Sequence, residues 1–191
     1  MEPLRDRLIA EFEEHAAVFA DTRKQCVEPL ERLIEAAAAC LSSGGKLMIF
    51  GNGGSAADAQ HWAAELTIRF TRKRRALAAV ALTTDTSAIT ACSNDFGYDQ
   101  IFARQIEALG RAGDIAIAIT TSGDSLNILC AVQRAKSAGI FTVAFTGETG
   151  GQVREMADLL IAVPSRTTAR IQEMHGLLGH QFCREIEAML G

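Results

Sequence analysis

From residue 46 onwards, short apolar runs alternate with longer stretches in which apolar residues recur at helical spacing. The predicted strands are 46–50, 77–83, 114–120, 140–146 and 159–163. The predicted helices are 55–70, 86–93 continuing through 98–109, 125–138, a short 152–156, and 168–190. The strands are continuous apolar runs, most clearly at 115–119, which is typical of strands buried on both faces. The pattern therefore predicts an α/β fold, a three-layer α/β/α sandwich around a five-stranded parallel sheet.

Residues 1–42 contain no strand-like run and form a helical extension in front of this pattern. Leu4, Leu8 and Phe12 follow helical spacing, as do the apolar residues of 27–37. We expect two helices, broken near Asp21 and Thr22, with 42–45 ending the second. Because their apolar faces have no sheet of their own, they must pack on the domain or on a neighbouring subunit. We interpret 1–191 as a single domain that includes this extension.

Composition excludes several classes of partner and location. The 191 residues carry a formal net charge of −4, which favours neither nucleic acid nor an anionic membrane. No stretch approaches the roughly 20 apolar residues of a membrane span. The five cysteines are scattered without a C-x-x-C pair, and the first residues lack a signal-peptide pattern. We therefore expect a cytoplasmic protein with neither a nucleic-acid nor a membrane partner.

A glycine-rich turn follows the first predicted strand and opens a helix. Gly51-Asn52-Gly53-Gly54 would be costly inside either a helix or a strand, and Ser55 is a plausible N-cap. A strand, a glycine turn and a helix N-terminus together leave backbone N–H groups facing outwards. Such a turn is suited to an anion or a polar sugar.

Three further polar loops, 82–86, 120–125 and 146–151, follow strands that end at the same edge of the sheet. The loop at 120–125 is the richest, with four hydroxyl residues and a glycine before a helix, an arrangement that suits phosphate. Any one of these loops is more simply explained as a capped turn, but several at one edge favour a ligand. Neither the Walker A spacing nor the dinucleotide fingerprint is present. We expect a ligand the size of a phosphosugar.

Four residues are candidate metal ligands. His61 and Glu65 lie four apart on one predicted helix face, although such a pair is more often a surface pair. Gln172 and His180 lie eight apart on the last helix, about 12 Å along its axis, near the limit for two side chains that reach one ion. A second subunit would be another source of a ligand. His175, on the same helix, is an alternative candidate ligand, and we do not include it in the predicted set.

The motifs together resemble the phosphoheptose isomerases of the sugar-isomerase (SIS) domain superfamily, over essentially the whole chain. The matching segments are Gly51–Ser55, His61-x-x-x-Glu65-Leu66-Thr67, Asn94–Gly97, Thr121–Ser125, and Arg170–His175 with His180. The resemblance implies a flavodoxin-like sandwich, a homotetramer and one zinc ion per subunit. The implied zinc ligands are His61, Glu65, Gln172 and His180. The implied substrate-binding residues are Asn52, Gly53, Gly54, Ser55, Glu65, Asn94, Asp95, Thr120, Thr121, Ser122, Ser125 and Gln172.

The implied reaction converts sedoheptulose 7-phosphate into D-glycero-D-manno-heptose 7-phosphate, the first step towards nucleotide-activated heptose and lipopolysaccharide. This aldose–ketose isomerisation moves a proton between C1 and C2 through an ene-diol. Our hypothesis is that Glu65 is the catalytic base and His180 its acid partner, with zinc polarising the carbonyl.

Two alternatives stay open. A related SIS-domain protein binds the bacterial replication initiator without catalysis, and it lacks a carboxylate at the position of Glu65. The chain also resembles other phosphosugar isomerases and phosphosugar sensors in its pocket loops, but these do not need the His–Glu–Gln–His set.

Two local features depart from the main pattern. The basic run 71–75 is interpreted as a solvated loop. Asp124 stands where relatives often carry Asn, and its charge would oppose a phosphate unless the side chain points away.

Overall fold

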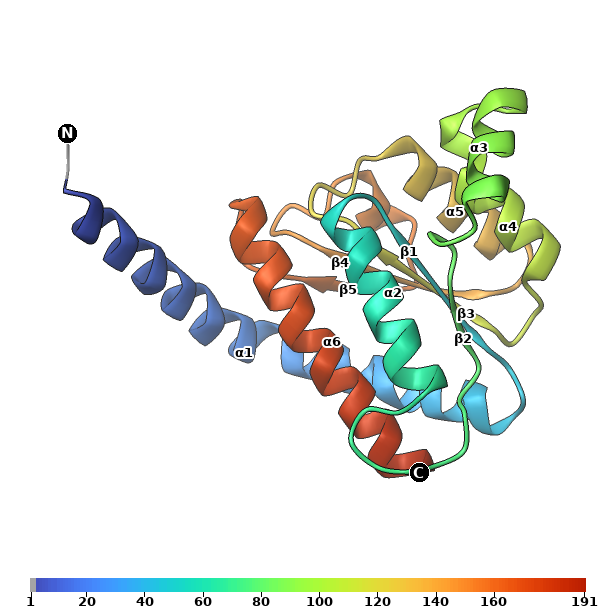
Figure 1. The fold of residues 1–191 in the computed structure, drawn as a ribbon, viewed down its shortest axis with the longest axis horizontal. Helices are drawn as coiled ribbons and strands as arrows, with labels where there is room; N and C mark the ends of the chain where they lie inside the picture. Colours follow the sequence, from blue (N-terminus) through green and yellow to red (C-terminus); the bar gives the residue numbers. More distant parts are fainter. Residues whose placement is uncertain (1–2) are drawn as a thin grey trace.

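A single parallel sheet forms the centre of the protein in a computed structural model that describes residues 3–191 (Figure 1). Its strands are β1 (Leu47–Gly51), β2 (Ala79–Ala81), β3 (Ile115–Ile119), β4 (Phe141–Thr146) and β5 (Leu159–Ala162). Their order is β2-β1-β3-β4-β5, with every neighbouring pair parallel. This is the flavodoxin-like order, so the predicted five-stranded parallel sheet is confirmed.

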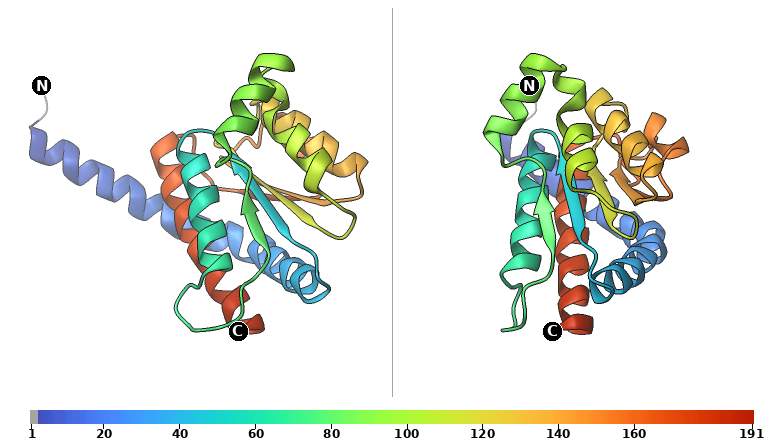
Figure 2. Two further views of the ribbon diagram at one scale, coloured as in Figure 1. Left: turned by 45° about the vertical axis from the view of Figure 1, so that its right-hand side comes forward. Right: turned by 90° about the vertical axis from the view of Figure 1, so that its right-hand side faces the viewer.

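Helices cover both faces of the sheet (Figure 2). One layer holds α1 (Leu4–Ser42), α2 (Gly54–Thr67) and α6 (Thr168–Leu190), and the other holds α3 (Thr86–Asp95), α4 (Ile101–Leu109) and α5 (Leu126–Ser137). Short 3₁₀ turns lie at η1 (Tyr98–Gln100) and η2 (Gln152–Glu155). Within β1, Leu47 and Ile49 join the α1–α2–α6 core, whereas Met48 and Phe50 join the other one. Alternate residues of one apolar strand thus supply two cores, which makes the continuous apolar run necessary.

The N-terminal extension is one helix, so the predicted break near Asp21 and Thr22 is wrong. Thr22 is buried in the interior face of α1, and Asp21 forms an exposed ion pair with Lys24 one turn on. These polar residues occupy helix faces and do not interrupt the backbone. The helix ends at Ser42, as predicted, with Gly44 in a left-handed conformation. Met1 and Glu2, the start of the predicted extension 1–42, lie outside the described residues.

Two helix starts differ from the prediction. The N-cap of α2 is Gly53, whose φ of 55° favours glycine, while Ser55 lies buried inside the first turn. The run predicted from 86 through 109 is divided into α3, η1 and α4, because Gly97 adopts a φ of 99°. Among residues 3–191, no helix is both long and apolar enough to cross a membrane.

Helices α2 and α6 lie side by side and run in the same direction (Figures 1 and 2). A Cβ added at Gly179 of α6 would overlap the indole ring of Trp62 on α2, and both residues are buried. Glycine therefore permits the close approach of the two helices. Directly beside this contact, His61 of α2 faces His180 of α6, each next in sequence to Trp62 and Gly179 respectively. This helix pair positions the candidate chemistry.

Candidate functional site

A small polar cavity of about 80 Å³ opens at the carboxyl edge of the sheet. It lies where β1 and β3 diverge, the point at which the strand order reverses and open α/β sheets bind their ligands. Most of its lining comes from the loops after these two strands, and Gln172 is contributed by α6. The lining residues are Asn52, Ser55, Ile119, Thr120, Thr121, Ser122, Ser125 and Gln172.

Two helix N-termini converge on this cavity. Helix α5 begins at Leu126, directly after the lining residue Ser125, and α2 begins at Gly54, between the lining residues Asn52 and Ser55. The first N–H groups of a helix have no partner inside the helix, and the helix dipole favours a negative charge there. The cavity is therefore suited to an anionic group such as phosphate.

Asn52 is held in place by two residues that the sequence analysis did not select. Its side chain exchanges two hydrogen bonds with Asn127, at 2.9 and 2.8 Å, and accepts a third from the Tyr98 hydroxyl at 3.1 Å. Asn127 is buried at the start of α5. A polar residue inside the apolar stretch Leu126–Ile128 was the available signal, since a buried amide needs a partner.

His61, His180 and Glu65 form a second cluster. The Nε2 atoms of the two histidines lie 2.9 Å apart, with their rings edge to face. One carboxylate oxygen of Glu65 lies 3.8 Å from Nε2 of His61. Asp58 lies on the same α2 face, one turn earlier, where burial raises the pKa of its carboxyl and the two histidines oppose that shift. Residues 119 positions apart thus meet because α2 and α6 pack together.

Gln172 lies apart from this pair. It sits beside Gly54, where a Cβ would come within 2.7 Å of its Nε2, two helical turns before His180. Its side chain lines the small polar cavity. Competing His175 is fully buried, and its Nε2 donates to the carbonyl oxygen of Thr146 at 3.1 Å. Burial lowers the pKa of His175 to about 4, so this histidine belongs to the core.

The donor set agrees with a zinc site. Two neutral imidazole nitrogens that bind one tetrahedral zinc ion lie roughly 3.3 Å apart, since each Zn–N bond is about 2.0–2.1 Å. The separation of 2.9 Å between His61 and His180 needs only a small opening, with Glu65 next to it as a third donor. As the side chains lie in this structure, residues 3–191 contain no group of three or more His, Cys, Asp or Glu side chains arranged to hold a metal ion.

Several predicted residues do not line the cavity. Asn94 and Asp95 lie exposed at the end of α3, where the Asn94 amide donates to the Asp95 carboxylate at 2.8 Å. Gly53 and Gly54 form the turn at its rim. Asp124 points towards η2, where its carboxylate accepts a hydrogen bond from the Gln152 backbone at 2.9 Å, and it is absent from the lining.

The basic run 71–75 is not wholly solvated, contrary to the prediction. The Arg74 side chain is only 1 % exposed and pairs with Glu187 of α6, whose side chain is 2 % exposed. Glu187 continues the buried stripe of Gly179 and Cys183 at a spacing of four. A carboxylate on an apolar stripe was the sequence signal for a buried partner.

The chain that carries this cavity and this histidine pair has known relatives that match it over nearly its full length. Residues 12–147 match the SIS domain family model. A phosphoheptose isomerase from Paramagnetospirillum magneticum is 57% identical over 176 residues, which is 92% of each chain. Another from Neisseria gonorrhoeae is 48% identical over 193 residues, covering 100% of this chain and 98% of the relative.

Solved structures give the same result. A phosphoheptose isomerase from Francisella tularensis superposes with a TM-score of 0.95 at 38% identity, over 98% of this chain and 100% of that one. The enzyme from Neisseria gonorrhoeae gives a TM-score of 0.92 at 46% identity, over 97% and 100%. The fold, the sequence identity and the length of the match all agree with those of phosphoheptose isomerases. The chain belongs to the phosphoheptose isomerase family of SIS-domain proteins.

Proposed function

We infer that the chain is an aldose–ketose isomerase that converts sedoheptulose 7-phosphate into D-glycero-D-manno-heptose 7-phosphate. The observation that carries this conclusion is Glu65, a carboxylate 3.8 Å from His61, which in turn contacts His180, in a chain that matches phosphoheptose isomerases over nearly its full length. A carboxylate beside two imidazoles supplies the acid and base groups that proton transfer needs. The initiator-binding alternative, which lacks this carboxylate, is not favoured.

We propose that the loop after β3 binds the substrate phosphate. Thr121, Ser122 and Ser125 offer hydroxyl groups, and the N-terminus of α5 offers free N–H groups at the same cavity. The hydroxyls of Thr120 and Ser122 also accept hydrogen bonds from the Gly123 and Asp124 backbones, each at 3.2 Å, which shapes the loop and leaves both O–H groups able to donate. Asn52 and Gln172 then face the sugar hydroxyls from the opposite wall. Asn94 and Asp95 remain proposed contacts from outside the cavity.

The proton transfer is assigned to Glu65 and His180. Glu65 removes a proton from C1 of the ketose and returns it to C2 of the ene-diol. His180 moves the proton between the two oxygens, so that the hydroxyl at C1 becomes a carbonyl while the carbonyl at C2 becomes a hydroxyl. Both residues come from helices that are fixed by the Trp62–Gly179 contact.

We further propose a bound zinc ion, with His61, Glu65, Gln172 and His180 as its ligands. When bound, zinc supplies Lewis-acid polarisation of the substrate carbonyl. Gln172 must turn from its place beside Gly54 to take part. A carboxylate held tightly by a metal is a weaker base, so Glu65 serves catalysis best if it contacts the ion only part of the time.

The test is an isomerase assay on purified protein, paired with metal analysis. We expect turnover of sedoheptulose 7-phosphate, and about one zinc per chain if the metal proposal holds. Dephosphorylated sedoheptulose is the matched control for the phosphate site, and its kcat/KM falls by at least 100-fold. An absence of turnover with the phosphorylated sugar in metal-replete protein would refute the assignment.

We propose that the partner in assembly is a second copy of this chain, in a homotetramer. The N-terminal half of α1 extends from the body and exposes Leu4, Leu8, Ile9 and Phe12 (Figure 1). A groove of about 590 Å³ between α1 and α6 adds further apolar surface. An apolar helix face and an apolar groove on one chain suit a self-complementary interface. The cytoplasmic location and the role in heptose biosynthesis remain predictions.

A further inference from the structure

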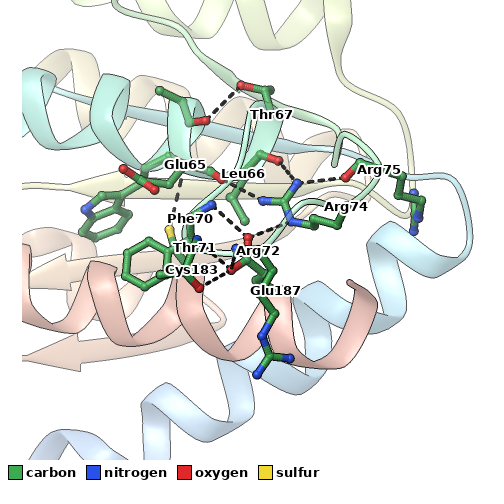
Figure 3. A network of polar contacts seen from close by, with 12 residues as sticks. Glu65, Leu66, Thr67, Phe70, Thr71, Arg72, Arg74, Arg75, Cys183 and Glu187 are labelled. Atoms are coloured by element: carbon green, nitrogen blue, oxygen red, sulfur yellow. Dashed lines mark hydrogen bonds and ion pairs between the residues drawn. The ribbon is translucent and has the colours of Figure 1, made fainter.

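A buried carboxylate on α6 binds the segment that leaves α2 (Figure 3). Glu187 accepts hydrogen bonds from the backbone N–H groups of Phe70, Thr71 and Arg72, at 2.9, 2.8 and 2.8 Å, and from the Thr71 hydroxyl at 2.8 Å. It also lies 3.3 Å from Nε of Arg74 as an ion pair. Both oxygens of one side chain are thus occupied by a segment more than 110 residues away in sequence.

Arg74 extends this contact back to α2. Its Nη1 donates to the carbonyl oxygen of Leu66 at 2.8 Å, and its Nη2 donates to that of Glu65 at 2.7 Å. The last four carbonyls of a helix have no partner further along the helix, and a cation is favourable there. Arg74 therefore caps the C-terminal end of α2 while it pairs with α6. We call Arg74, Glu187 and the backbone of residues 70–72 the interhelix bridge.

The interhelix bridge reaches both halves of the candidate site. The carbonyl that Arg74 binds belongs to Glu65, the assigned base. The Phe70 residue whose N–H binds Glu187 places its ring 6.0 Å from the ring of His180. A displacement at the bridge would therefore move Glu65 and the surroundings of His180 together.

Stability alone is a weak reason for this arrangement. A buried ion pair often contributes no more net stability than well-packed apolar residues, because both charges lose their hydration. Position is a better reason, since a displacement of about 1 Å at a catalytic group can cost about 100-fold in rate. The fixed fork of Arg74 binds two carbonyls of α2 through its Nη atoms while its charge pairs with Glu187, an arrangement that the single ammonium of Lys cannot reproduce.

We propose that Arg74 and Glu187 are positioning residues, which set the separation between Glu65 on α2 and His180 on α6. This rests on the proposed roles of Glu65 and His180. The bridge touches neither the cavity lining nor the histidine nitrogens. It acts on proton transfer through the backbone of Glu65, and leaves the phosphate site unaffected.

The test compares Glu187→Gln with Asp114→Asn in the full-length enzyme. Asp114 is a matched control, because it is a buried carboxylate that accepts hydrogen bonds from the Lys46 and Arg111 backbones beside the start of β3, and these partners belong to neither α2 nor α6. We expect kcat to fall by about 10- to 100-fold in Glu187→Gln with KM within threefold of wild type. Asp114→Asn is expected to keep kcat within threefold despite a comparable loss of stability in urea unfolding.

A second measurement reports on the positions of the histidine rings and does not depend on catalytic turnover. The chain has four histidines, so the ring proton–nitrogen signals of each are resolvable by NMR. The signals of His61 and His180 shift in Glu187→Gln, those of His15 and His175 do not, and none shifts in Asp114→Asn. If Glu187→Gln fails to fold, Arg74→Lys takes its place, with the same expected result.

The two proposals fail differently. Unchanged kcat, or unchanged His61 and His180 signals, in the folded bridge variant would overturn the positioning role while wild-type turnover keeps the isomerase assignment. Absence of turnover in the wild type, together with selective shifts of His61 and His180, would overturn the isomerase assignment and keep the bridge as the device that sets their separation.

Discussion

His175 illustrates how environment decides the role of a single residue. It lies on α6 between the proposed ligands Gln172 and His180, yet it has no exposed surface and its ring packs edge-on against Phe145. Its Nε2 donates to Thr146, whereas its Nδ1 has no hydrogen-bond partner. A proton on that ring would therefore add an unpaired charge in the core, which lowers the pKa to about 4.

Stability should consequently decrease in mild acid. The unfolded chain binds a proton at His175 below a pH of about 6.5, whereas the folded chain binds it only near pH 4. Between these values the unfolded state holds more protons, so the free energy of unfolding falls as the pH is lowered. The loss is on the order of 3 kcal/mol across this window. Urea unfolding at pH 7, 6, 5 and 4 measures it.

His175→Leu is the comparison for that measurement, because it removes the titrating group and leaves an apolar side chain in an apolar site. The variant should lose less stability than wild type between pH 6.5 and 4, while the carboxylates contribute equally to both. Parallel curves for the two proteins would show that His175 does not control this part of the pH dependence.

Local patterns identified residues whose role depends on their neighbours in sequence. The turn at Gly53 and the i, i+4 pair of His61 and Glu65 are of this kind, because a turn and a helix face are set within a few residues. Arg74 and Glu187 are not, since their meeting depends on how two distant helices pack. The basic run 71–75, considered alone, predicts a solvated loop. Only its ion-pair partner Glu187, 113 positions after Arg74, shows that the Arg74 side chain is buried.

At the scale of elements, the contact between α2 and α6 determines whether His61 and His180 meet. Gly179→Ala should separate the helices, because the new Cβ overlaps the buried indole of Trp62. We expect a loss of about 1–3 kcal/mol in the free energy of unfolding, together with a lower kcat. Urea unfolding and the isomerase assay check the two effects.

Gly176→Ala is the control for the same helix. A Cβ at Gly176 meets no atom within 4 Å, and alanine has the better helix propensity by about 1 kcal/mol. This variant should be as stable as wild type or more so, with unchanged kcat. Equal stability of the two alanine variants would show that the helices do not depend on glycine for their approach.

Strands and helices were predictable where apolar periodicity is strong, and less so at their ends. The five strands and α6 lie where the pattern put them, because burial on both faces forces continuous apolar runs. The break predicted near Asp21 and Thr22 was wrong, since two consecutive polar residues, one exposed and one buried, resemble a turn in sequence. The order of the strands could not be obtained from periodicity and comes from the three-dimensional structure.

At the scale of the whole molecule, the N-terminal half of α1 is the part that a single chain leaves exposed (Figure 2). Leu8 and Phe12 expose 54% and 76% of their surface there. In the proposed homotetramer they are buried, so Leu8→Ser with Phe12→Ser should yield dimers or monomers. Light scattering after size-exclusion chromatography measures the mass. Leu109→Ser, an exposed leucine in the opposite helical layer, should leave the tetramer intact.

The central claim is that this fold catalyses an isomerisation with the Glu65 carboxylate, and the most direct measurement is turnover of sedoheptulose 7-phosphate by wild type and Glu65→Gln. Glutamine keeps the size of the side chain and removes the base, so the helix contacts remain. The account predicts clear turnover by the wild type and a loss of at least about 1000-fold in kcat for a variant of unchanged fold. Isomerisation by Glu65→Gln at a rate near that of wild type would contradict it.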